Sequence, residues 1–289
     1  MEIVKAFPIQ ALHGLVYGML LFLVASGLTL IFGMMGVLNF AHGALYMLGA
    51  YFSFSILVYT GNFWLSLIVS PILVGVLSIL MERYLLRKIH RFGHVHQLLL
   101  TFGVAYIIEE MVKWIWGNEP LPVKIPQFLT GSLSFLGIIY PKYRLFILLV
   151  SFVVFVILFL ILFRTRAGII VMAAVHNADM VNALGINVPL VFTLLFGVGG
   201  ALAGLAGVIG GPYLITHPGM AATIIVDLFV VIVVGGLGSL GGALLASFLI
   251  GELQSFGVLF FPQLALVLEF LLMAVVLIIK PEGLLGEKE

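Results

Sequence analysis

The sequence contains no cysteine and very little charge. Only 9% of its 289 residues are Asp, Glu, Lys or Arg, whereas 63% are hydrophobic. The lack of cysteine excludes disulfide bonds, thiolate metal sites and cysteine nucleophiles. Soluble domains carry about 25% charged residues, so a soluble fold of this length could not cover its surface with so few. We therefore expect most of the surface to face lipid, in a polytopic membrane protein.

Nucleotide-binding and catalytic motifs are also missing. No lysine follows a glycine, so no G-x-x-x-x-G-K-[ST] loop can form, and no H-E-x-x-H occurs. Ser239 lies in the glycine cluster "GGLGSLGG", but a catalytic serine needs a positioned base and an oxyanion hole. An intramembrane hydrolase is therefore the weakest hypothesis. We expect no cofactor in this chain. We also expect no nucleic-acid partner, since the net charge is only +1.

Long apolar runs predict an all-α transmembrane bundle in a single domain, residues 1–289. A helix needs about 20 apolar residues to cross a bilayer, and the run "LFILLVSFVVFVILFLILF" at 145–163 is the clearest example. Segments outside the spans are too short to build a core of their own. Eight or nine spans are expected, the others lying near 12–32, 41–60, 63–82, 97–117, 188–211, 222–235, 240–261 and 263–280.

Basic residues predict the orientation of these spans. The loop "ERYLLRKIHRFGHVH" after the third span holds Arg83, Arg87, Lys88 and Arg91, and short loops rich in Lys and Arg stay in the cytoplasm. Counting onward, segment 164–187 is cytoplasmic, and the proline-rich segment 118–143 is an outer loop with a small hairpin. The side of the N-terminus stays open, because 33–43 could be a full turn or a break within the membrane.

The stretch "GMMGVLNFAHGALYMLGAY", residues 33–51, interrupts the apolar pattern. Gly36 and Gly43 weaken a helix, and Asn39 and His42 would share one helix face. Irregular backbone at membrane depth needs surrounding protein or a water-filled cavity. These four residues therefore mark a broken or re-entrant segment beside the translocation pathway. Asn39 and His42 could hold the break or contact the solute, and we favour the first. A second Gly/Pro-rich interruption near 210–221 suggests a repeat.

The cytoplasmic segment 164–187 is predicted to contain an amphipathic helix. Val171, Val175, Ala178 and Val181 recur at helical spacing and form one apolar stripe. Gly185 stands where the helix should stop. Helices that lie on lipid headgroups usually carry Lys or Arg on their polar face, and none follows Arg166 here. This pattern favours docking into a cytoplasmic partner.

Acidic residues inside the spans support an alternative function. Glu109 and Glu110 can pair with Lys113 at helical spacing, which lowers their cost in lipid. Three other acids stand alone in apolar runs: Asp227, Glu252 and Glu269. Each could bind an ion or a proton, which would make the protein a stand-alone secondary transporter driven by an ion gradient.

Three stretches resemble one transporter family. Residues 25–51, "ASGLTLIFGMMGVLNFAHGALYMLGAY", are similar to the signature of the LivH-type permeases of bacterial ABC importers for branched-chain amino acids. Residues 173–187, "AAVHNADMVNALGIN", resemble that family's ATPase-coupling loop. Residues 233–256, "VVGGLGSLGGALLASFLIGELQSF", also follow the family pattern. The resemblance covers essentially the whole chain, although the uncharged "AAVHN" departs from the more charged run that is common there.

The resemblance implies a permease subunit of the bacterial inner membrane. Such permeases work with a second homologous permease subunit (LivM-like), two cytoplasmic ATPase subunits that bind the ATP, and a periplasmic substrate-binding protein. It places Asn177, Ala178, Leu184 and Gly185 in the coupling segment gripped by the ATPase. Branched-chain or other hydrophobic amino acids are the expected substrates, and the wider family also imports urea, amides and aromatic acids.

Overall fold

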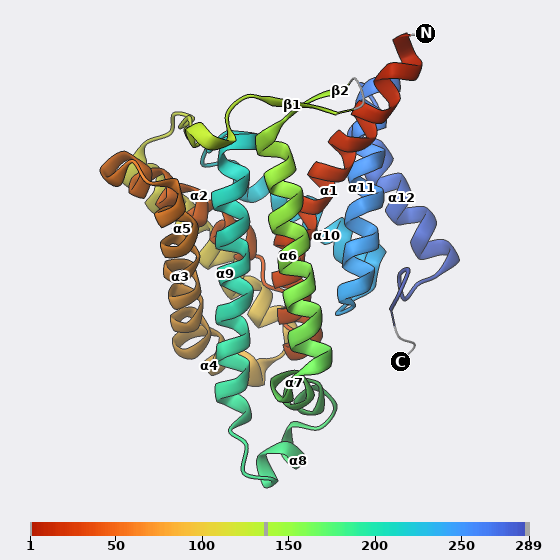
Figure 1. Ribbon diagram of the computed structural model, residues 1–289. Helices are drawn as coiled ribbons and strands as arrows, with labels where there is room; N and C mark the ends of the chain where they lie inside the picture. Colours follow the sequence, from red (N-terminus) through yellow and green to blue (C-terminus); the bar gives the residue numbers. More distant parts are fainter. Residues whose placement is uncertain (1, 136–137, 287–289) are drawn as a thin grey trace.

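The computed structural model describes residues 2–135 and 138–286, and each predicted span corresponds to a helix. Six helices in this described part are long and apolar enough to cross a membrane: α1, α2, α3, α6, α9 and α11. The chain is thus a multi-pass helical bundle (Figure 1). The bounds are α1 Glu2–Met35, α2 His42–Thr60, α3 Phe63–Met81, α5 His94–Trp116, α6 Lys142–Arg164, α9 Val188–Leu214, α10 Met220–Gly235, α11 Leu240–Phe260 and α12 Ala265–Ile279.

The other three predicted spans, α5, α10 and α12, do not meet that criterion. Helix α10 has 16 residues and α12 has 15, both short for a full crossing. Helix α5 carries Glu109, Glu110 and Lys113, whose predicted pairing is confirmed by N–O distances of 2.8 Å for both ion pairs. A count of eight or nine spans therefore stays a prediction.

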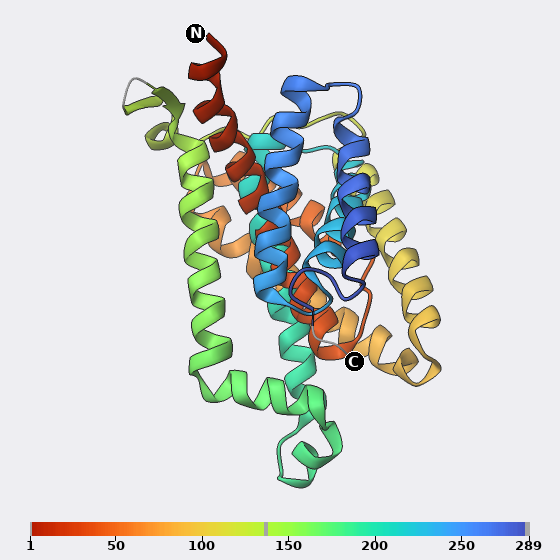
Figure 2. The same cartoon turned by 90° about the vertical axis from the view of Figure 1, so that its right-hand side faces the viewer.

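The two ends of the bundle differ in structure. One end carries the N-terminus and a hairpin of β1 (Ser132–Phe135) and β2 (Ile138–Pro141), which confirms the hairpin expected in 118–143 and adds two strands to the all-α fold. The opposite end carries α7 (Arg166–His176) and α8 (Ala178–Ala183), with α7 running across the base (Figure 2). The N-terminus shares the end that the basic residues predict to be outside. Segment 36–41 turns back into the bundle, because His42 at its end lies 3.1 Å from the carbonyl oxygen of Val24, which is well inside α1.

Glycines let the helices of the bundle approach closely. A Cβ on Gly18 of α1 would lie 2.5 Å from the carbonyl oxygen of Ser247 on α11. On the other side of the bundle, a Cβ on Gly197 of α9 would lie 2.6 Å from the side chain of Ile79 on α3. Real Cβ atoms do not come that near, so these helices pack with their backbones almost in contact, as small residues permit in membranes.

An ion pair between the buried Glu82 and the exposed Arg87, in the continuation of α3, contacts α9 at the end of the bundle that carries α7. Helix α3 continues into a π-helical turn, Glu82–Leu86, followed by α4 (Arg87–Ile89) and a 3₁₀ turn (His90–Phe92). The Arg87 guanidinium donates to both Glu82 carboxylate oxygens, at 3.2 and 3.1 Å, and to the carbonyl of Pro189 at 2.8 Å. Thr193 of α9 also donates to the Glu82 carboxylate, at 2.5 Å.

Candidate functional site

The first break begins where α1 ends. Gly36 has a φ of +63° and donates its N–H to the carbonyl of Phe32 at 2.8 Å, which ends the helix in a conformation that glycine adopts easily. Thr101 of α5 supports the irregular backbone that follows. Its Oγ1 accepts from the N–H of Phe40 at 3.2 Å and lies 3.4 Å from the carbonyl oxygen of Leu38. The bundle thus satisfies groups that lipid could not.

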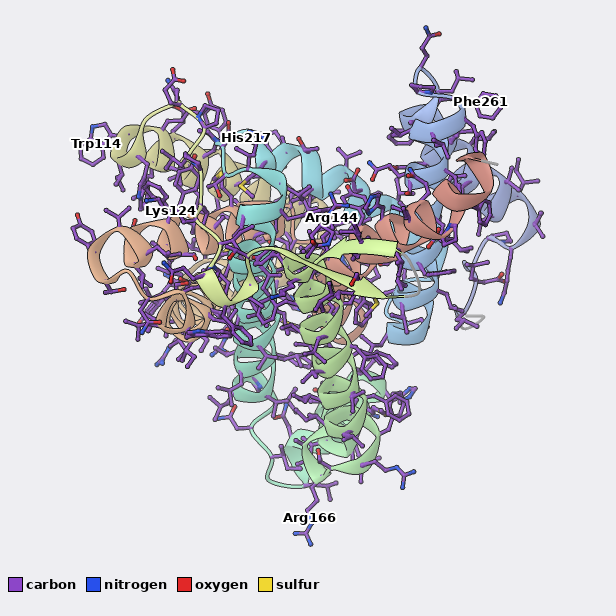
Figure 3. All side chains as sticks on the ribbon, turned by 45° about the horizontal axis from the view of Figure 1, so that its top comes forward. Trp114, Lys124, Arg144, Arg166, His217 and Phe261 are labelled. Carbon is purple, nitrogen blue, oxygen red and sulfur yellow. The ribbon has the colours of Figure 1, made fainter. Side chains whose placement is uncertain are left out.

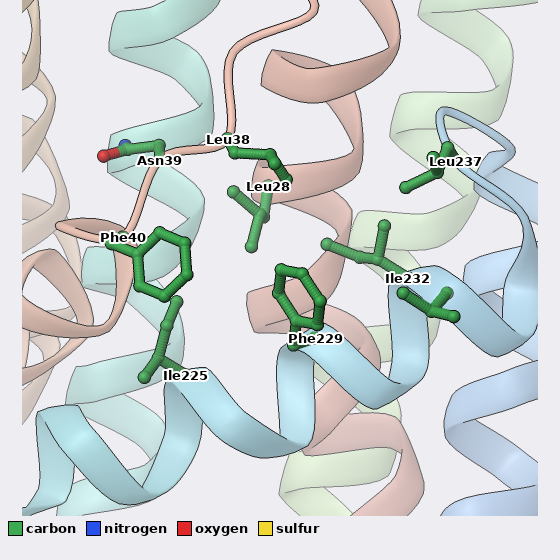
Figure 4. Close-up of a pocket in the computed structure, with 9 residues that line it drawn as sticks. Leu28, Leu38, Asn39, Phe40, Ile225, Phe229, Ile232 and Leu237 are labelled. Carbon is green, nitrogen blue, oxygen red and sulfur yellow. The ribbon is translucent and has the colours of Figure 1, made fainter. Parts of the chain in front are cut away.

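Asn39 stabilises the turn into α2. Its Oδ1 accepts from the N–H of Ala41 at 3.1 Å, and its carbonyl accepts from His42. Asn39 borders a pocket of about 10 Å³ that is otherwise lined by apolar side chains such as Phe40 and Phe229 (Figure 4). In that view its amide points away from the apolar side chains. Such a pocket is too small for a solute.

His42 and Gly43 lie where helices meet. The His42 Nε2 is 3.1 Å from the carbonyl oxygen of Val24 on α1, and the residue is fully buried. Its ring sits against Gly27, where a Cβ would lie 3.0 Å from the imidazole. A Cβ on Gly43 would overlap the carbonyl of Ala221, the second residue of α10. These contacts fit the structural role that we favour from the sequence, and contact with the solute stays the alternative.

The second break lies slightly later than the sequence suggests. Helix α9 runs through Gly210, Gly211 and Pro212 to Leu214, so only 215–219 interrupt the helices. Ile215 has a φ of +64°, which is rare for a β-branched residue. The outer loop is attached to this break, because the N–H of Leu121 donates to the carbonyl of Thr216 at 2.7 Å.

The segment 164–187, predicted to be cytoplasmic, contains two helices, which corrects the expectation of one. Asn177 has an extended φ of −156°, and its Oδ1 accepts from the N–H of Met180 at 2.9 Å, so it ends α7 and caps α8. Asn and Asp side chains compete with helical hydrogen bonds and favour caps. The continuous stripe is therefore broken: Val171 and Val181 are buried, but Val175 is 41% exposed.

Gly185 ends α8 as expected. It has a φ of +85°, and its N–H donates to the carbonyl of Asn182 at 2.9 Å, while the N–H of Ile186 donates to that of Val181 at 3.3 Å. This pair of bonds is a Schellman motif, which requires the left-handed conformation that glycine supplies. Leu184 precedes it with 75% of its side chain exposed.

The predicted coupling segment is buried on one face and exposed on the other. Ala174, Val181 and Val188 form a small buried cluster, against which Ala178 packs. The opposite face presents Met180, which is 61% exposed, together with Leu184. Of the four predicted coupling residues, Asn177, Leu184 and Gly185 are exposed and Ala178 is half-buried.

The isolated acids occupy different environments. Asp227 of α10 is buried and accepts a hydrogen bond from the Tyr17 hydroxyl at 2.8 Å. Glu269 of α12 is buried close enough to Asp227 to interact with it electrostatically. Glu252 instead lies against Gly14 of α1. Ser239 accepts from the N–H of Gly242 at 3.1 Å as the N-cap of α11, which explains its place without catalysis.

Comparison with known proteins supplies the family. The family described as "Branched-chain amino acid transport system / permease component" matches residues 10–279. The permease protein BraD of a high-affinity branched-chain amino acid transport system in Pseudomonas aeruginosa is 30% identical, over 97% of this chain and 96% of the relative. The corresponding LivH protein of Escherichia coli is 28% identical over the same shares.

An archaeal relative extends the comparison. The probable branched-chain amino acid transport permease LivH of Methanocaldococcus jannaschii is 28% identical, over 94% of this chain and 90% of the relative. No solved structure matches. Because the family model covers nearly the whole chain and the full-length bundle fits it, the chain belongs to the branched-chain amino acid transport permease family and is a permease component, not an enzyme.

Proposed function

We propose that this chain is one permease subunit of an ATP-driven importer in the bacterial inner membrane. It takes up branched-chain or other hydrophobic amino acids, or a related small polar solute, delivered by a periplasmic binding protein. A second, homologous permease (LivM-like) completes the pathway, and two cytoplasmic ATPase subunits bind and hydrolyse the ATP. The names of the relatives support the substrate class.

One observation carries the coupling part of this proposal. The segment from Arg166 to Asn187 projects beyond the base of the bundle, with α8 at its tip (Figure 2). Its caps fix the backbone, and it exposes Met180 and Leu184, two large apolar side chains. A short helix with apolar anchors is the shape that fits a groove on a partner protein. The ATPase therefore moves α8, and α8 passes the movement to α9 through residues 184–188.

Copurification tests the proposed assembly. We expect the tagged chain, expressed with the gene products encoded beside it, to bring down an ATPase and a second permease. Uptake should stop when ATP is depleted and persist when the ion gradient is collapsed. Recovery of the chain alone, with uptake that survives ATP depletion and ends with an uncoupler, would contradict the proposal.

Gly185→Val tests the coupling segment itself. Valine cannot hold a φ of +85° without a cost of about 1–2 kcal/mol, so the Schellman turn should open and α8 should lose its fixed position. We expect ATP-driven uptake to fall at least about fivefold, which corresponds to about 1 kcal/mol. The amount of chain inserted in the membrane should not change. Uptake assays and membrane immunoblots measure the two.

Gly61→Val is the matched control. Gly61 also has a positive φ, +66°, ends a helix and has open space around its Cα. It lies between α2 and α3, at the end of the bundle opposite α8. Equal loss of uptake in both variants would mean that Gly185 acts only through general backbone strain.

A further inference from the structure

A second cavity lies beside the break at 215–219, and it brings this break together with Asp227. It has a volume of about 150 Å³ and is lined by residues of α1, α2, the end of α9, the break and α10: Tyr17, Tyr46, Leu214, His217, Met220, Thr223, Ile224 and Asp227. At about 30 Å³ per water molecule it has room for about five waters, the scale of a small aliphatic amino acid. His217 lies at the outer end of the bundle (Figure 3).

The cavity contains an acid without a cationic partner. Asp227 is 8% exposed and lines the cavity, yet its side-chain hydrogen bond comes from the neutral hydroxyl of Tyr17. None of the described lysine and arginine side chains forms a salt bridge with it. Glu269, buried on α12, which packs against α10, adds a second carboxyl group to the same region. An ionisable group at this depth normally has a partner or a ligand.

An unpartnered hydroxyl is the second observation. Tyr46 of α2 is 1% exposed and lines the cavity, and its hydroxyl has no hydrogen-bond partner among the described residues. Buried polar groups are nearly always hydrogen-bonded in native proteins. An ammonium group has three donors and can reach both the Asp227 carboxylate and the Tyr46 hydroxyl oxygen, so one ligand would satisfy both.

The other end of the cavity suits a negative group. Helix α10 begins at Met220, and Gly219 before it provides no side-chain cap. Met220 and Thr223, in the first turn, line the cavity together with His217. The N–H groups of Met220 and Thr223 already donate to the carbonyls of His217 and Gly219, at 3.1 and 3.3 Å. The positive end of the helix dipole still stabilises a carboxylate, as in transporters with broken helices. The cavity therefore offers an acceptor for a cation and the positive end of a helix for an anion.

We propose that this cavity binds the zwitterionic end of an amino acid, with Asp227 and Tyr46 holding the ammonium group and the start of α10 holding the carboxylate. The aliphatic side chain then packs on Leu214 and Ile224. The inference rests on the proposed function for its choice of ligand. It adds what that function leaves open, a binding site within the permease itself.

Cysteine labelling tests the proposal, because the chain has no native cysteine. Thr223→Cys places a thiol on an exposed residue of the cavity wall. The labelling rate of this thiol is measured with a cationic (2-aminoethyl) and an anionic (2-sulfonatoethyl) methanethiosulfonate, in membranes that contain the full chain. Each rate is divided by the rate of the same reagent with a free thiol in solution. We expect the cation to be favoured at least about tenfold by the unpaired carboxylate. With Asp227→Asn added, the ratio should approach one.

Three ligands of one shape identify which group is recognised. Leucine and 3-methylbutylamine should slow labelling of Thr223→Cys, whereas 4-methylpentanoate, which lacks the ammonium group, should not. Asp227→Asn should abolish the protection, while Glu252→Gln, which lies away from the cavity, should retain it. Equal protection by 4-methylpentanoate, protection that survives Asp227→Asn, or no charge preference would overturn the proposal.

Two controls distinguish loss of the fold from loss of the Asp227 charge. The neutral methyl methanethiosulfonate should label Thr223→Cys equally with and without Asp227→Asn if the fold is intact. Asp227→Glu, which keeps the charge, should keep the preference for the cation if Asp227→Asn fails to fold. Labelling needs neither ATPase nor ATP, so its failure is distinct from a failure of the importer assignment. A chain that binds ATPases but is not protected by leucine would contradict the site alone.

Discussion

Replacing Gly49 by valine is expected to prevent most of the chain from accumulating as folded protein. Gly49 of α2 faces Gly204 of α9, and a Cβ there would overlap the Gly204 carbonyl and lie 2.6 Å from its Cα. Backbone atoms cannot turn aside as a side chain can, so α2 and α9 would have to separate. Overpacking usually costs about 1–3 kcal/mol, and a rigid backbone contact in the centre of the bundle should reach or exceed the upper value.

Gly103→Val provides the comparison for this prediction. Gly103 lies inside α5, but nothing stands within 4 Å of the position of its Cβ. Both variants introduce the same β-branched residue into a helix, so the difference between them measures the contact alone. Size-exclusion profiles and apparent melting temperatures of the detergent-solubilised proteins should separate them. Similar yields and melting temperatures would show that α2 and α9 do not depend on this approach.

Arg87→Met should produce the second large loss of stability. The side chain of Glu82 is only 4% exposed and that of Arg87 is 40% exposed. Removing the guanidinium leaves a buried carboxylate with Thr193 as its remaining partner. Breaking a buried pair from one side costs about 3–5 kcal/mol, and the exposure of Arg87 places the expected loss near the lower value. The apparent melting temperature should fall clearly.

The double variant Arg87→Met/Glu82→Gln tests whether the unpaired Glu82 carboxylate causes the loss of stability in Arg87→Met. It removes both charges, so it should recover most of the stability lost in Arg87→Met, because replacing a buried pair entirely is often nearly neutral. Arg83→Met is the control, since Arg83 is exposed and contacts the ring of Tyr84. If Arg83→Met and Arg87→Met were equally destabilising, or if Glu82→Gln gave no rescue, the ion pair would not be the cause.

The membrane helices could be predicted because apolar run length directly reflects bilayer thickness. The boundaries of α2 and α11 agree with the predicted 41–60 and 240–261 within one residue. Length alone could not decide whether α10 and α12 cross completely, since their apolar runs are shorter than the bilayer requires. Counting charges could not decide at which end of the bundle the N-terminus lies, because the answer depends on the three-dimensional path of residues 33–43.

The helix ends in the predicted coupling segment, residues 164–187, could be predicted only in part from the sequence. Gly185 was correctly placed at a helix stop, because a left-handed turn demands a residue without a Cβ. The break at Asn177 was missed, although Asn followed by Asp two residues later is a recognisable helix start. The apolar spacing continued across this break because Val171 of α7 and Val181 of α8 are both buried against the protein.

The cavity residues could not be identified from spacing at all. Tyr17 and Tyr46 lie on the consecutive helices α1 and α2, whereas Asp227 lies on α10, far away in the sequence, and only the packing of these helices brings the three together. The isolated Asp227 was the available signal, and it was noted as a possible ion site. Thr101 gave no signal, because its partners belong to the irregular backbone of another segment.

The hydrogen bond between the N–H of Leu121 and the carbonyl of Thr216 limits how far the α9–α10 junction can move from the end of α5. Residues 117–121 join the end of α5 to this pair, and five extended residues span at most about 17 Å. Any outward swing of the α9–α10 junction must therefore carry the end of α5 with it or begin by rupturing one hydrogen bond. Protection of the Leu121 amide from deuterium exchange consequently reports which of these two motions the outer side of the protein uses.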